Sequence, residues 1–242
     1  MIRIASIELT KYVRAFVIII ICYGLFFTVL VSRFDAKNFF QYGIFDLDTF
    51  KVVNSTFTKL ITSAIPFTII LNICNEFKNG YALKLISNGL SRPAYCSFKF
   101  ILAGALAVIS MLLYVLIISF LLTIHKSSYF GSAIFIGSVI HSLVFSMFFS
   151  SVAVSFALLI RTWQYSLLVY YGYAVVETII VLRFEESAPW IRYLPFNLAI
   201  SIFQLQAVPE KFGDYLLPAC IILPFCLVIV WCCYHFFKKA DL

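Results

Sequence analysis

The chain has 242 residues, of which 63% are apolar and only 12% are charged, and its mean hydropathy is +1.01. Soluble domains contain about 25% charged residues, and a chain of this length cannot hide so much apolar surface from water, so the composition indicates an integral membrane protein and excludes disordered, collagen-like and disulfide-stapled secreted classes. The net charge of +7 is interpreted as basic residues that orient the membrane helices and contact anionic lipid. No nucleic-acid binding is expected, because no basic tract with interleaved aromatic residues lies outside the apolar segments.

The first membrane helix is predicted over residues 15–32, an uncharged run of 18 residues. At about 1.5 Å per residue this run just crosses about 30 Å of hydrocarbon. Arg3, Lys11 and Arg14 precede it, as in the start of a signal peptide, but the run is followed by no small-residue cleavage site. We therefore expect an uncleaved helix with a cytoplasmic N-terminus, preceded by a short interfacial helix.

Five further membrane helices are predicted from the uncharged runs that follow. Their approximate ranges are 53–75, 100–124, 133–160, 165–182 and 215–237. Residues 193–209 are also uncharged, but their prolines and side-chain amides suit an interfacial or re-entrant segment better than a span. The sequence therefore predicts an all-α protein in which residues 1–242 form a single transmembrane domain of six helices.

The distribution of Lys and Arg residues orients these six helices. The pieces 1–14, 75–99, 161–164 and 238–242 contain ten of them in about fifty residues, whereas the opposite side has eight in about seventy. Cytoplasmic loops carry the excess of positive charge in membrane proteins. Both termini are therefore expected in the cytoplasm.

The polar pieces of the chain show no catalytic pattern. There is no G-x-x-x-x-G-K-[ST] phosphate loop and no Ser/His/Asp or Cys/His set at a shared depth. Glu185, Glu186 and Arg192 faintly resemble the glutamate pair and arginine of intramembrane CAAX-type proteases, but the arginine is too distant and the later histidine motifs are missing. We expect no enzyme activity, no catalytic residues, and neither a metal nor a cofactor on this chain.

The most specific stretch, residues 75–100, connects the second and third predicted helices. Phe77, Tyr81 and Leu85 recur at i, i+4 and i+8, while the two neighbouring lysines lie elsewhere on the helical wheel, so a short amphipathic helix is predicted. Gly89 is a natural C-terminal cap for it. On these residues alone, a helix that simply lies on the membrane surface is an equally good interpretation.

The same stretch carries, in order, an acid, a lysine, a glycine, two leucines, a Ser-Arg pair and a further lysine, which are Glu76, Lys78, Gly80, Leu83, Leu85, Ser91-Arg92 and Lys99. This order resembles the signature of the ABC-2 type transporter permeases, the membrane subunits of ATP-binding cassette exporters. The YLPFN segment at 193–197 also resembles the extracellular re-entrant region of that family. Pro93 can open the third membrane helix in its first turn.

The resemblance implies a permease subunit of the bacterial inner membrane that exports a substrate. Separate cytoplasmic ABC ATPase subunits, which hold the ATP and Mg²⁺, would power this transport. A second permease chain, identical or related, would complete the pathway. The implied ATPase coupling residues are Glu76, Phe77, Lys78, Gly80, Tyr81, Leu85 and Arg92. The aromatic and leucine side chains among them would face either the ATPase groove or neighbouring helices, and Lys78 and Lys84 would face acidic groups or lipid.

Three ionisable residues fall inside predicted spans, at similar depths: Lys59, His141 and Glu177. Because a lone charge in hydrocarbon is costly, we hypothesise that Glu177 pairs with Lys59 or, as a second choice, with His141. The alternative is that each side chain reaches the nearby outer surface alone.

Two other functional classes stay open. A secondary transporter or channel would need coupling or selectivity groups among these few ionisable residues, and the hydropathy shows no inverted repeat to support it. A non-transporting scaffold subunit of a secretion or motility assembly is the other alternative.

Overall fold

The computed structural model describes residue 21 and residues 47–124, 133–201 and 212–239. The predicted first membrane helix at 15–32, apart from residue 21, and the interfacial helix before it lie outside these residues. All regular structure in the described part of the chain is helical. The elements are α3 (Leu47–Lys78), α4 (Tyr81–Ser87), α5 (Arg92–Ile124), α6 (Ala133–Ile160), α7 (Trp163–Phe184), the 3₁₀ helix η1 (Pro189–Tyr193), α8 (Pro195–Ser201) and α9 (Phe212–Lys239).

Four of these helices, α5, α6, α7 and α9, are long and apolar enough to cross a membrane. The chain is thus an all-helical protein with the features of a multi-pass membrane protein, as the composition predicts. Helix α3 has 32 residues but is not among the four, which were identified within the described residues alone. The count of six spans stays a prediction.

Four of the five long helices, α3, α5, α7 and α9, extend beyond their predicted ranges. Helix α6 has the predicted bounds, but α5 begins at Arg92, eight residues before the expected position. Its true start is set by Ser91, whose Oγ accepts a hydrogen bond from the Ala94 backbone N–H at 3.3 Å, an N-cap contact. Charge was therefore a poor boundary marker, because Arg92 and Lys99 both lie within the helix.

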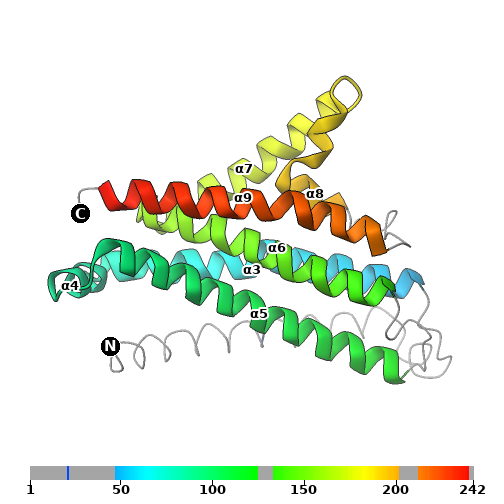
Figure 1. Ribbon diagram of the computed structural model, residues 1–242, viewed down its shortest axis with the longest axis horizontal. Coiled ribbons are helices and arrows are strands. Elements are labelled where there is room, and N and C mark those ends of the chain that lie inside the picture. The colour runs from blue at the N-terminus through cyan, green and yellow to red at the C-terminus, as the bar shows by residue number, and fades with distance from the viewer. Residues whose placement is uncertain (1–20, 22–46, 125–132, 202–211, 240–242) are drawn as a thin grey trace.

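Helix α6 is the centre of the bundle. It packs against α3, α5 and α9, and Figure 1 shows these four helices running side by side along the long axis of the molecule. Two thirds of the membrane-length segment of α6 is buried, against 17% of α7. Helix α7 leaves the bundle at an angle, and η1 and α8 return from its far end (Figure 1).

One end of the bundle brings together α4, the turn between α6 and α7, and the last turns of α9 (Figure 1). We call it the α4 end. The Phe77 ring of α3 lies 6.4 Å from the Phe237 ring of α9, and the Arg161 guanidinium of the α6–α7 turn lies 5.7 Å above Phe77. Three of the pieces that the charge distribution assigns to one side of the membrane therefore meet at one end. That this end faces the cytoplasm stays a prediction.

Candidate functional site at the α3–α4–α5 junction

Two glycines separate α4 from the helices on either side. Gly80 adopts φ 67°, its N–H donates to the Phe77 carbonyl at 3.0 Å, and its own carbonyl accepts from the Lys84 N–H at 3.0 Å. Gly80 therefore ends α3 and begins α4 within one residue. A positive φ of this kind is readily adopted by glycine and is strained for residues with a β-carbon.

The second glycine closes α4 as predicted. Gly89 adopts φ 98°, and its N–H donates to the Ile86 carbonyl at 3.1 Å, while the Leu90 N–H donates to the Leu85 carbonyl at 3.1 Å. These two bonds form a Schellman motif. Pro93 follows as the second residue of α5, so both predicted boundary signals are confirmed.

Helix α4 has two distinct faces. Ala82 and Leu85 are buried in the core cluster, against which Tyr81 also packs, whereas Leu83, Lys84 and Ser87 are exposed. An amphipathic helix is therefore present over Tyr81–Ser87, but the prediction that Phe77 belongs to it is wrong, because the turn at Gly80 places Phe77 on α3. The side chains of Phe77, Tyr81 and Leu85 were expected to face either the ATPase groove or neighbouring helices. In the structure they pack against the core of this chain. The face that remains open to a partner is the opposite one.

A buried ion pair joins the end of α3 to the start of α5. The Lys99 Nζ lies 2.7 Å from Glu76 Oε2 and donates a 2.8 Å hydrogen bond to Oε1, with the two side chains 1% and 4% exposed. The Tyr95 hydroxyl donates to Glu76 Oε2 at 2.7 Å, and Lys99 Nζ lies 5.0 Å from the Tyr95 ring centroid. The sequence places Glu76 and Lys99 in one motif, and the fold makes them partners.

Three aromatic rings extend this contact to α9. Phe77 and Tyr95 lie 6.1 Å apart, Tyr95 stacks on Phe237 at 6.1 Å, and Phe77 meets Phe237 at 6.4 Å. Arg161, above Phe77, holds a positive φ of 65° in the two-residue turn between α6 and α7. Sequence reasoning missed Tyr95, Phe237 and Arg161. Tyr95 alone carried a usable signal, because it lies one helical turn before Lys99.

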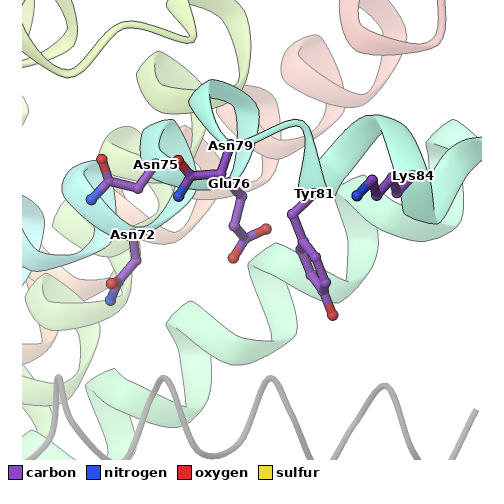
Figure 2. Close-up of a pocket in the computed structure, with 6 residues that line it drawn as sticks. All are labelled: Asn72, Asn75, Glu76, Asn79, Tyr81 and Lys84. Carbon is purple, nitrogen blue, oxygen red and sulfur yellow. The ribbon is translucent and has the colours of Figure 1, made fainter.

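A polar pocket of about 300 Å³ opens between the end of α3 and α4. Figure 2 shows its α3 side, formed by successive polar side chains, and the ammonium end of Lys84 turned toward Tyr81 and α3. The Nδ2 atom of Asn72 is buried and has no hydrogen-bond partner among the described residues. The lining residues are Asn72, Asn75, Glu76, Asn79, Tyr81 and Lys84.

The other predicted site residues are more dispersed. Lys78 is exposed at the last residue of α3, and Arg92 is half-buried at the first residue of α5. His141 is buried in α6, with its ring 4.1 Å from that of Phe145. Lys59 belongs to α3, and its side chain lies outside the described part of the structure.

Glu177 is hydrogen-bonded to the backbone of α8, a partner that its sequence did not suggest. Its side chain is 2% exposed, and its Oε1 accepts a 2.7 Å hydrogen bond from the backbone N–H of Asn197. Its Oε2 is buried and has no hydrogen-bond partner among the described residues. The Asn197 N–H belongs to the first turn of α8, where backbone N–H groups have no acceptor within the helix and favour a negative charge. Pro195, at the first residue of α8, was the available signal for such a helix start.

The Glu177–Lys59 pair stays a prediction, because the structure does not describe the Lys59 side chain. Comparisons of this chain with protein-family models, with curated proteins and with solved structures found no match.

Proposed function

We propose that this chain is the membrane-spanning permease subunit of an ABC transporter, in which a separate cytoplasmic ATPase subunit hydrolyses ATP. The proposal includes six spans, cytoplasmic termini in a bacterial inner membrane, and a second permease chain that completes an export pathway. Its support comes from the resemblance of residues 76–99 to the ABC-2 type permeases and from the way these residues are held together in the fold.

The observation that carries the proposal is the buried contact between Glu76 and Lys99, with Tyr95 as the third member. A subunit that is moved from outside needs a surface element fixed to its membrane helices. Helix α4 meets this need, because it is closed by defined turns at both ends and because the ion pair joins the helix before it to the helix after it. Displacement of α4 therefore moves α3 and α5 together.

The aromatic contacts give this displacement a path into the rest of the bundle. Phe77 and Tyr95 both touch Phe237 of α9, and Arg161 connects Phe77 to the turn that begins α7. A displacement of α4 in the plane of the membrane would thus move α3, α5 and α9 together. The start of α7, the least buried of the four membrane-length helices, is connected through Arg161.

The exposed face of α4 is the proposed contact with the ATPase. It presents Leu83, Lys84 and Ser87, and Lys78 lies just before it on α3. Leu83 is 45% exposed, whereas Ala82 and Leu85 on the other face of α4 are buried in the core of this chain. We assign Leu83 as the apolar contact and the two lysines as partners for acidic groups.

The test is co-expression of the tagged chain with the ABC ATPase subunit encoded nearest to it in its genome. We expect the two to purify together with ATP hydrolysis, and Leu83→Asp to lower the amount of retained ATPase about tenfold, equivalent to one lost contact of about 1.4 kcal/mol. Ser187→Asp, which adds the same charge beyond the far end of α7, is the matched control and should retain the ATPase.

Two results would refute the proposal in different ways. Failure of the unmodified chain to bind or stimulate any ATPase subunit of its genome would exclude the permease function. A complex that Leu83→Asp and Ser187→Asp weaken equally would leave the function intact but would remove α4 as the contact surface.

A further inference from the structure

We propose that the pocket between the end of α3 and α4 binds the phosphate group of an anionic phospholipid. This site shares Lys84 with the proposed ATPase contact, but its other lining residues are Tyr81 and side chains of α3. It requires only that the chain is embedded in a membrane.

The charges around the pocket favour an anion. Glu76 contributes an acidic group to the lining, but its charge is neutralised by Lys99 at 2.7 Å. Lys84 then leaves the lining with one net positive charge, because its ammonium has no acidic partner among the described residues. A phosphate diester carries the complementary single negative charge, and its oxygens accept hydrogen bonds from ammonium and amide groups.

One buried hydrogen-bond donor of the pocket residues also lacks an acceptor among the described residues. Asn72 places a buried Nδ2 there with no partner among the described residues, and leaving such a donor unpaired is unfavourable. Asn75 and Asn79 add two further amides from the same side of α3 (Figure 2). A volume of about 300 Å³ is on the order of ten water molecules, which is ample for a phosphate diester with its glycerol hydroxyls.

The surface next to the pocket favours a lipid over free phosphate. Going back along α3 from Asn75, the side chains at i−4 and i−8 are Leu71, which is half-buried, and Phe67, which is 42% exposed. Residues four apart lie on one face of a helix, so a single exposed track changes from apolar to polar where the pocket begins. An acyl chain can lie along Phe67 and Leu71 while its phosphate enters the pocket. Inorganic phosphate would leave this track unused.

The experiment uses the full chain purified in mild detergent without any ATPase, with lipid binding measured by native mass spectrometry. Phosphatidylglycerol, phosphatidylcholine and inorganic phosphate are the three probes. We expect preferential retention of phosphatidylglycerol, and an affinity about tenfold lower in Lys84→Gln and in Asn72→Leu. Lys78→Gln removes a lysine six residues away that does not line the pocket, and it should leave the affinity within about twofold.

Each other outcome overturns the assignment. Equal losses in Lys84→Gln and Lys78→Gln would show general attraction between basic residues and anionic lipid. Competition by inorganic phosphate at equal concentration would show a phosphate site without lipid specificity, and equal retention of phosphatidylcholine would remove the role of charge. Asn72 lies away from the exposed face of α4, so an Asn72→Leu chain that loses lipid but keeps its ATPase separates this inference from the proposed function.

Discussion

Glu76 at the α4 end and Glu177 within α7 are both withdrawn from water, with 4% and 2% of their side chains exposed, yet the fold compensates the two carboxylates by different means. Glu76 is paired with the ammonium of Lys99 and with the Tyr95 hydroxyl. Glu177 accepts a hydrogen bond from the backbone N–H of Asn197, in the first turn of α8. Glu76 thus belongs to a charge pair between side chains. Glu177 instead caps the start of α8, although it lies twenty residues before Asn197 in the chain.

The difference separates two mechanical roles. An ion pair between side chains fixes two long helices, α3 and α5, at the end where they emerge toward α4. A carboxylate on the N-terminus of a helix fixes only the start of that short helix against α7. We therefore regard the α3–α4–α5 junction as the rigid part through which force is transmitted, and the α7–α8 hairpin as an attachment whose position rests on one capping contact and on packing around Phe196.

The largest expected effect comes from breaking the charge pair on one side. Lys99→Met leaves the Glu76 carboxylate buried without its counter-ion, and the free energy of unfolding should fall by about 3–5 kcal/mol. The double change Glu76→Leu/Lys99→Met removes both charges and should recover much of that loss, because two apolar side chains can replace a buried pair. Reversible unfolding in mixed micelles of the unmodified chain, Lys99→Met, Glu76→Leu and the double variant measures the coupling.

A double variant that is less stable than either single one would contradict this explanation. It would show that the site depends on the packing of these two side chains and that their charges contribute little. The comparison with Glu177 would then lose its basis.

At Glu177 the neutral isostere should be tolerated far better. The glutamine introduced by Glu177→Gln keeps an oxygen that accepts from the Asn197 N–H, so we expect a loss of about 1 kcal/mol, whereas Glu177→Leu leaves that N–H unpaired at about 1–3 kcal/mol. The same unfolding measurement ranks the two variants. If Glu177→Gln costs as much as Lys99→Met, and Lys59→Gln does too, then Glu177 has an ionic partner in Lys59 and the two glutamates are alike.

Local features of this fold follow closely from the sequence. The bounds of α6, the amphipathic pattern of α4 and the stop at Gly89 depend on residues within one or two turns of one another, and such short-range rules are strong for long apolar helices and for glycine caps. The uncharged runs placed the starts of α5 and α7 too late, because charged or polar residues at a helix end were treated as loop, whereas Pro93 correctly marked the first turn of α5.

The contacts of the site depend on chain segments that are far apart, and these could not be read from the sequence. The partner of Glu76 lies 23 residues away, across the turn that α4 makes, and Phe237 enters from the opposite end of the chain. Glu177 was matched with side chains at a similar predicted depth, whereas its partner is the backbone of α8. Backbone donors leave no trace in residue type, apart from the proline that opens the helix.

Two tyrosines sharpen the comparison at a smaller scale. The Tyr95 hydroxyl donates to the charged Glu76 at 2.7 Å, and the Tyr170 hydroxyl donates to the neutral carbonyl of Thr62 at 2.9 Å. Hydrogen bonds to charged groups contribute about 1.5–3 kcal/mol and neutral ones about 0.5–1.5. Tyr95→Phe should therefore destabilise the protein more than Tyr170→Phe, although both rings are fully buried. Equal losses in thermal unfolding would mean that Glu76 does not use its third partner.

The smallest effect concerns the backbone of the two regions. Gly80 at the α4 end has φ 67°, and Gly172 lies inside α7, with nothing within 4 Å of a β-carbon built on either residue. Since no clash is involved, Gly80→Ala should cost about 1 kcal/mol through the left-handed conformation alone, while Gly172→Ala should be neutral or stabilise by about 0.5 kcal/mol through helix propensity. Gly80→Asn should lie between them, because asparagine tolerates this conformation better than alanine. The order of the three unfolding midpoints is the test, and a chain in which Gly80→Ala is as stable as Gly172→Ala would show that α4 can rejoin α3 without this turn, which a rigid junction does not allow.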